Sequence, residues 1–149
     1  MIVALLRVSL TTEGGFLSLE GRQIVRALGT RFRLNEELSF DRFLTATTPG
    51  AVQTAELFAD RVDYVGEVAA LPALDGRVPP AVLAPRVLEG GGSVVVVGDE
   101  PDLSALGAFL VGRPTFPPLV HAQVSIVEDR RPAYAYRPGE TGRALLLVS

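Results

Sequence analysis

Apolar residues along the chain fall into continuous runs and periodic ones. Residues 2–8 (IVALLRV) and 94–97 (VVVV) are nearly uninterrupted, which is typical of strands buried on both faces of a sheet. Residues 19–32 and 49–62 place apolar side chains three and four positions apart, which predicts amphipathic helices that pack on that sheet. Ser18 suits the N-cap of the first helix, and Pro49 suits the first turn of the second.

The rest of the pattern alternates short strands and helices. We expect strands over 41–46, 64–71 and 143–149, helices over 81–89 and 101–111, and a hairpin of strands 121–129 and 132–138 around the turn residues DRR. This order predicts one α/β domain over residues 1–149. Its expected architecture is a three-layer α/β/α sandwich around a mostly parallel sheet.

Composition narrows the chemistry and the partners. With no cysteine and one histidine, the chain excludes thiolate nucleophiles and multi-histidine metal sites, and we expect no cofactor and no metal. A net charge of −3 without a basic run argues against nucleic acid as a partner. No apolar run approaches the roughly 20 residues that span a bilayer, and the apolar N-terminus lacks a signal-peptide pattern. We therefore expect a cytoplasmic protein with no membrane partner.

Two turns with distinctive residues follow the strongest predicted strands. Residues 7–9 (RVS) follow the first strand, and residues 98–101 (GDEP) follow the strand over 94–97. In open α/β sheets, functional residues gather at the carboxyl ends of the strands. The sequence therefore predicts that Arg7 and Asp99 approach each other at this edge.

Four segments stand in a family-like order and at family-like intervals over roughly residues 1–136: LLRVS, LSLEGRQIVRALG, TATTPGAVQTAE and VVVVGDEPDLS. They resemble the motifs of the histidine phosphatase superfamily, and its SixA-type phosphohistidine phosphatase branch in particular. The matching family motifs are Arg-His-Gly, Leu-Thr-x-x-Gly, Ser-Pro-x-x-Arg-Ala-x-Gln-Thr-Ala and Gly-His-x-Pro. The resemblance implies a phosphoglycerate mutase-like fold and a reaction through a phosphohistidine intermediate.

Key family positions are occupied differently here. The resemblance places the nucleophilic histidine at Val8, the second histidine at Asp99, the second phosphate-binding arginine at Gly50, and the glycine after the nucleophile at Ser9. Only Arg7 remains from the core set. Valine cannot form the covalent intermediate, and an aspartate repels phosphate. These departures predict a degenerate site and a catalytically inactive chain, a pseudo-phosphatase.

Several side chains at this site carry open alternatives. Asp99 and Glu100 stand at the N-terminal end of the helix that starts near 101. Asp99 either pairs with Arg7 and fills the phosphate site, caps this helix while Arg7 pairs elsewhere, or takes a new catalytic role as nucleophile or general base. His121, at the start of a predicted strand, is either an ordinary hydrogen-bonding residue or a substitute nucleophile. Ser9 is either a turn-stabilising hydroxyl or a surrogate nucleophile that lacks a base.

The sequence therefore supports three functions. The first is binding or regulation without catalysis, with another protein as the partner, a phosphorylated one included. The second is a weakly active phosphohistidine or phosphomonoester phosphatase that uses residues other than the family's. The third is a phosphate or phosphoprotein sensor. Tyr134 and Tyr136 share one strand face, and they either cover a helix or form a patch for a homodimer.

Overall fold

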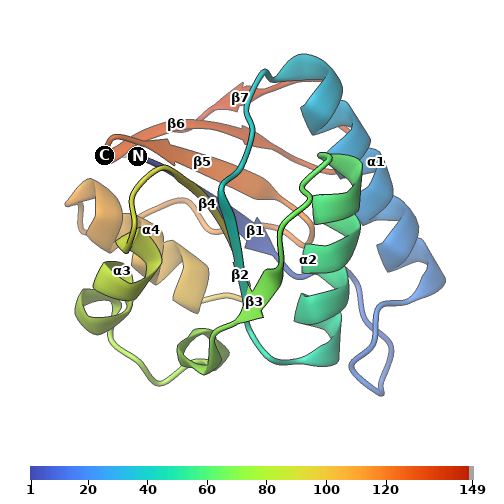
Figure 1. Cartoon of the computed structure of the whole chain (residues 1–149), viewed down its shortest axis with the longest axis horizontal. Helices are drawn as coiled ribbons and strands as arrows, with labels where there is room; N and C mark the ends of the chain where they lie inside the picture. Colours follow the sequence, from blue (N-terminus) through green and yellow to red (C-terminus); the bar gives the residue numbers. More distant parts are fainter. Residues whose placement is uncertain (148–149) are drawn as a thin grey trace.

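The computed structural model describes residues 1–147 and builds them around a seven-stranded sheet with strand order β3-β2-β4-β1-β5-β6-β7 (Figure 1). The strands are β1 (Ile2–Arg7), β2 (Arg42–Thr45), β3 (Val68–Ala70), β4 (Ser93–Gly98), β5 (Val124–Glu128), β6 (Arg131–Tyr136) and β7 (Ala144–Leu145). The helices are α1 (Leu19–Asn35), α2 (Pro49–Arg61), α3 (Pro80–Leu88) and α4 (Asp102–Val111), and a 3₁₀ turn, η1 (Pro72–Asp75), precedes α3.

Helices cover both faces of the sheet, which confirms the expected three-layer sandwich. α1 and α2 pack together on one face, and α3 and α4 pack together on the other (Figure 1). Strands β3, β2, β4 and β1 are parallel, whereas β5, β6 and β7 add antiparallel pairs. Because β6 again points the same way as β1, the sheet is mostly parallel, as expected.

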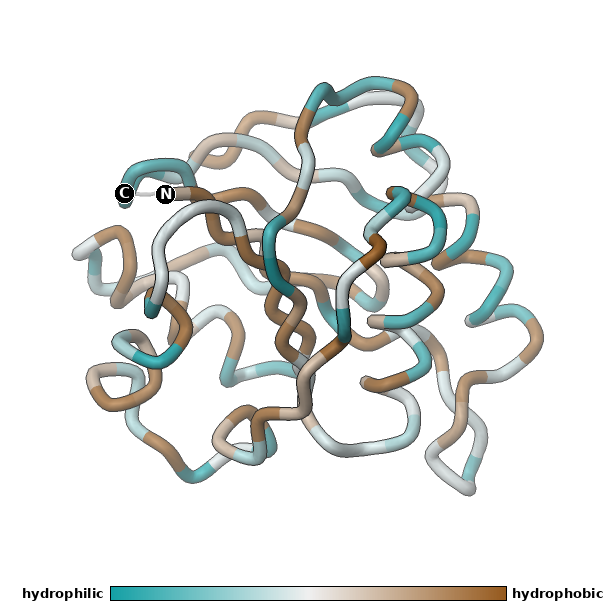
Figure 2. The backbone as a smooth tube through the Cα atoms, in the orientation of Figure 1, coloured by the Kyte–Doolittle hydropathy of each residue, from teal (hydrophilic) through white to brown (hydrophobic). Residues whose placement is uncertain are grey.

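The continuous apolar runs form the centre of this sheet. β1 and β4 are neighbours, and every residue of β4 is buried. Figure 2 shows hydrophobic residues concentrated in these central strands. A strand with helices on both faces has no solvated side, so its sequence shows no polar alternation.

The helix signals also match the structure. The Ser18 hydroxyl accepts a hydrogen bond from the Gly21 amide at 2.9 Å and caps α1 as expected. α1 and α2 approach closely at Gly29, where an added Cβ would lie 2.6 Å from the Arg61 Cβ. A larger residue at position 29 would force the two helices apart.

The observed boundaries differ from the predicted ones mainly where turns replace regular structure. α1 extends to Asn35, and β5 begins at Val124, so His121 lies in a turn and not in a strand. The predicted last strand is reduced to Ala144–Leu145, and residues 148–149 lie outside the described residues. Within residues 1–147, no helix combines the length and the hydrophobicity that crossing a membrane requires.

A polar cluster fastens the end of α1 to the last strands. The Glu36 carboxylate accepts hydrogen bonds from the Tyr136 hydroxyl and the Arg143 guanidinium, which also stacks 3.9 Å from the centre of the Tyr134 ring. Tyr134 and Tyr136 are both buried, and the Tyr136 ring contacts Phe32 of α1. The two tyrosines therefore cover a helix and do not form an exposed patch.

Replacing Glu36 by glutamine is expected to lower the free energy of unfolding at pH 7 by about 1–3 kcal/mol, because charge-assisted hydrogen bonds are lost. Burial acts to raise the pKa of the Glu36 carboxyl, but hydrogen bonds from Arg143 and Tyr136 outweigh it and hold the pKa below the ordinary 4.5. A depressed folded-state pKa stabilises the protein above pH 4.5, and this contribution is lost as the pH falls through the folded pKa. Urea titrations across pH measure both effects.

Glu37→Gln is the matched control for this prediction, because Glu37 is the exposed neighbour of Glu36. Its expected effect is below about 0.5 kcal/mol at every pH. Equal losses in the two variants, or a Glu36→Gln loss that persists unchanged at acid pH, would contradict the role of the cluster.

Candidate functional site

The two distinctive turns meet at the carboxyl ends of β1 and β4. Arg7 is in register with Gly98, so the side chain of Arg7 lies next to the turn that follows β4. The Arg7 Nε donates a hydrogen bond to the Asp99 Oδ1 at 2.8 Å. The predicted approach of Arg7 and Asp99 is therefore present. The Asp99 carboxylate therefore engages one of the hydrogen-bond donors of the Arg7 guanidinium.

The side chain that caps the next helix is Glu100, and not Asp99 as the second alternative had it. One oxygen of the Glu100 carboxylate accepts from the Ser104 amide at 2.8 Å, inside the first turn of α4. The other accepts from the Leu119 amide at 3.1 Å. Leu119 in turn supplies the carbonyl that accepts from the Arg7 Nη1 at 2.8 Å. Glu100 thus ties the loop before β5 to α4, and that loop orients Arg7.

His121 lies beside the position that the family gives to its nucleophile. Its Nδ1 is 2.9 Å from the main-chain oxygen of Val8. A carbonyl oxygen only accepts, so Nδ1 carries the proton and Nε2 of the neutral ring keeps its lone pair. His121 as a whole is exposed to solvent. The loop before β5 therefore brings an imidazole into contact with the backbone of position 8.

The backbone around His121 is held in an uncommon conformation. Ala122 adopts φ 61°, in the left-handed region that β-carbon-bearing residues rarely occupy. Two hydrogen bonds fix this turn against β1: the Ala122 amide donates to the Arg7 carbonyl at 3.1 Å, and the Arg7 amide donates to the Gln123 carbonyl at 3.0 Å. Strained backbone of this kind clusters at functional sites.

Ser9 points away from this site. It is fully buried, and its hydroxyl donates to the Gly21 carbonyl at 2.9 Å. Its amide donates to the Thr54 hydroxyl at 3.2 Å. Ser9 therefore links β1 to α1 and α2, which agrees with the structural alternative for its hydroxyl.

Gly50 leaves no room for the arginine that the family places there. A Cβ at this position would lie 2.8 Å from the Thr11 Cγ2, 2.9 Å from the Gly15 carbonyl oxygen and 3.3 Å from the Val8 Cγ1. The loop after β1 therefore packs directly onto the start of α2. Val8 is buried beneath it, with 6% of its surface exposed.

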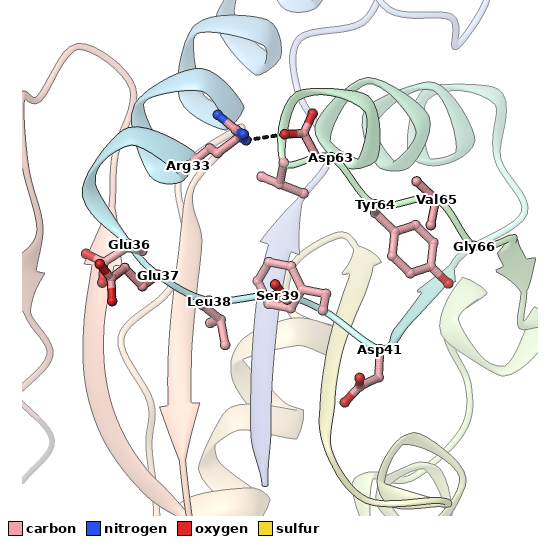
Figure 3. Close-up of a pocket in the computed structure, with 12 residues that line it drawn as sticks. Arg33, Glu36, Glu37, Leu38, Ser39, Asp41, Asp63, Tyr64, Val65 and Gly66 are labelled. Atoms are coloured by element: carbon pink, nitrogen blue, oxygen red, sulfur yellow. Dashed lines mark ion pairs between the residues drawn. The ribbon is translucent and has the colours of Figure 1, made fainter.

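A hollow of about 690 Å³ lies at the opposite end of the strands (Figure 3). Its acidic side chains are largely paired: Asp63 with Arg33, Asp41 with the Ser93 amide, and Glu36 with Arg143. It contains none of the residues singled out from the sequence. Among residues 1–147, no group of three histidine, aspartate or glutamate side chains is placed to hold a metal ion.

Comparisons with solved structures decide the fold. Protein histidine phosphatase SixA, solved with tungstate, superposes with a TM-score of 0.72 at 22% identity, over 86% of this chain and 88% of that one. The histidine phosphatase fold is present. A SixA protein from Agrobacterium tumefaciens gives 0.72 at 15% identity over 92% and 98%. Mycobacterial glucosyl-3-phosphoglycerate phosphatase with inorganic phosphate gives 0.65 at 17% identity over 85% and 89%. No family model and no curated protein matches the sequence.

These neighbours confirm the predicted resemblance and correct the prediction that the chain is not an enzyme. The structures that share this histidine phosphatase fold are named as phosphatases, and no finding shows that activity is lost. The prediction inferred loss of activity from the residues at three family positions, Val8, Gly50 and Asp99, and these replacements do not by themselves exclude an enzyme. The fold brings the ring of His121 to the backbone of Val8 from a distant loop.

Two parts of the site could not be found from the sequence. The Leu119 carbonyl that holds Arg7 is a backbone acceptor, and backbone acceptors have no residue signature. The orientation of His121 depends on the turn at Ala122, which sequence reasoning assigned to a strand. Alanine rarely adopts a positive φ, so the residue pattern does not predict this turn.

Proposed function

We propose that the site formed by Arg7, Val8, Asp99 and His121, called the Arg7 site below, hydrolyses phosphoryl groups with His121 as the nucleophile. One observation carries the proposal: the His121 Nδ1 hydrogen bond to the Val8 carbonyl, at 2.9 Å. This contact leaves the Nε2 lone pair available on a positioned ring. The histidine phosphatase fold supports it, because its solved examples named above are phosphatases.

The reaction has two displacements at phosphorus. The Nε2 lone pair forms a bond to phosphorus, and the bond to the leaving group breaks with its electron pair on that group. A water oxygen then forms a bond to the phosphorus, and the P–N bond breaks with its electron pair on Nε2. This restores the neutral imidazole and releases inorganic phosphate that carries both protons of the water. Arg7 stabilises the negative charge on the transferring oxygens.

The charges at the site favour a substrate with a weak bond to phosphorus. Arg7 already donates to Asp99 and to the Leu119 carbonyl, and Gly50 provides no second guanidinium. Transition-state stabilisation is therefore modest, which disfavours stable phosphomonoesters. The P–N bond of phosphohistidine or phosphoramidate breaks more readily. We therefore assign phosphohistidine-type substrates to this site, with slow turnover.

Trapping the intermediate tests the proposal directly. The chain contains a single histidine, so any phosphohistidine formed on it is located at His121. After incubation with labelled phosphoramidate, purified protein is expected to carry an acid-labile, alkali-stable phosphate. Mass spectrometry should place this phosphate on the peptide that contains residue 121.

If the protein binds tungstate but no phosphate is trapped, the proposed hydrolase is wrong. The site would then be a phosphate sensor, in which Arg7 binds the anion and no reaction follows. Failure of both measurements would overturn the proposal. If the phosphate is found on a residue other than His121, the phosphatase activity is supported but the assignment of His121 as the nucleophile is wrong.

A further inference from the structure

Arginine side chains gather on the α1/α2 side of the molecule, although the sequence contains no continuous basic run. Two adjoining hollows of about 410 and 480 Å³ lie there, and Arg26 and Arg61 line both of them. Arg31 lines the first and Arg22 the second. These four residues are called the arginine groove. The fold thus creates a local basic surface on a chain with a net charge of −3.

Most of the charge in the arginine groove has no internal counterion. Within residues 1–147, Arg22, Arg26 and Arg31 form no ion pair, and Arg61 reaches only Asp60, at 3.8 Å. The three side chains from α1 are half-buried, so their stems pack on the helices. A planar guanidinium presents a fork of N–H donors that matches the geometry of a carboxylate.

An exposed apolar residue lies beside these charges. Leu34 lines the first hollow with Arg26 and Arg31, and 74% of its surface is exposed. Thr30 adds a hydroxyl to the same hollow. We propose that the arginine groove binds an acidic segment of a partner protein, with carboxylates on Arg26 and Arg31 and an apolar side chain on Leu34.

The groove fits a polypeptide better than a nucleic acid. Among residues 1–147, no aromatic side chain lines either hollow, so these residues offer no ring on which a base could stack. Glu56 and Asp60 line the second hollow and would repel a continuous phosphate backbone. An acidic segment with an occasional basic residue can pair with both kinds of charge. Complementary charge of this type sets partner specificity and association rate.

A labelled peptide of glutamate with leucine at every fourth position is the probe. Fluorescence anisotropy is expected to show saturable binding that weakens as salt is added. Arg26→Glu is expected to weaken it at least about tenfold, a change of about 1.4 kcal/mol. NMR shifts of backbone amides should map the peptide onto α1 and α2.

Arg113→Glu is the matched control, because it makes the same change of charge at an exposed residue that follows α4 on the other face of the sheet. Equal weakening by Arg26→Glu and Arg113→Glu, absence of saturable binding, or tighter binding of an oligothymidylate would overturn the proposal. Arg26→Gln repeats the measurement if circular dichroism shows that the glutamate variant is unfolded. Phosphoramidate hydrolysis should not change in any of these variants, which separates this proposal from the proposed function.

Discussion

Replacing His121 by alanine is expected to abolish the catalysed hydrolysis of phosphoramidate. The rate that remains should equal the rate measured without any protein. The exposed ring makes one hydrogen bond, to the Val8 carbonyl, so the free energy of unfolding should fall by no more than about 1 kcal/mol. Initial rates of phosphate release, together with thermal unfolding of the same preparations, separate loss of the nucleophile from loss of the fold.

His121→Gln distinguishes a nucleophile from a positioning residue. The glutamine amide can still donate to the Val8 carbonyl, but it has no nitrogen lone pair able to attack phosphorus. Both variants should be equally inactive. Ser9→Ala serves as the control for the alternative nucleophile that the sequence offered, and it should stay active because the Ser9 Oγ is buried against Gly21. Activity that survives in His121→Gln but disappears in Ser9→Ala would contradict the assignment.

Replacing Asp99 by asparagine is expected to tighten tungstate binding by about tenfold to a hundredfold. Two unit charges about 4 Å apart repel by roughly 4 kcal/mol at an effective dielectric constant of 20. The Asp99 side chain is 56% exposed, so solvent screens part of this and the expected gain is about 1.4–2.8 kcal/mol. Asparagine also keeps an oxygen that can accept from the Arg7 Nε.

Asp102→Asn provides the control for Asp99→Asn, since it removes the same charge from the first turn of α4. Its effect on tungstate binding should be within about twofold, and isothermal titration calorimetry measures both variants. Unchanged or weaker binding in Asp99→Asn would mean that the Arg7 guanidinium does not contact the anion.

The layers and the order of elements followed from the sequence because each element carries a strong local signal. The buried runs at 2–8 and 94–97, the Ser18 cap and Pro49 all act within a few residues of their position. The contact between Arg7 and Asp99 was also predictable. Both follow neighbouring parallel strands whose carboxyl ends meet at one edge.

The chemistry of the site was harder to predict because it depends on contacts between distant segments. His121 reaches Val8 across 113 positions, and a turn in an uncommon backbone conformation directs it there. The arginine groove has the same origin: Arg26 and Arg61 belong to different helices and are neighbours only after α1 and α2 pack. Reading each motif position alone therefore missed both the contact between His121 and Val8 and the clustering of the arginines.

The packing of Thr11 and Gly15 against Gly50 makes the present arrangement difficult to reverse. An arginine introduced at position 50 must displace a main-chain oxygen, 2.9 Å from its Cβ, before it can contact a phosphate. Introducing the family arginine on its own is therefore expected to lower the stability of the fold. Residues 11–15 would have to be rebuilt before position 50 can accept an arginine side chain.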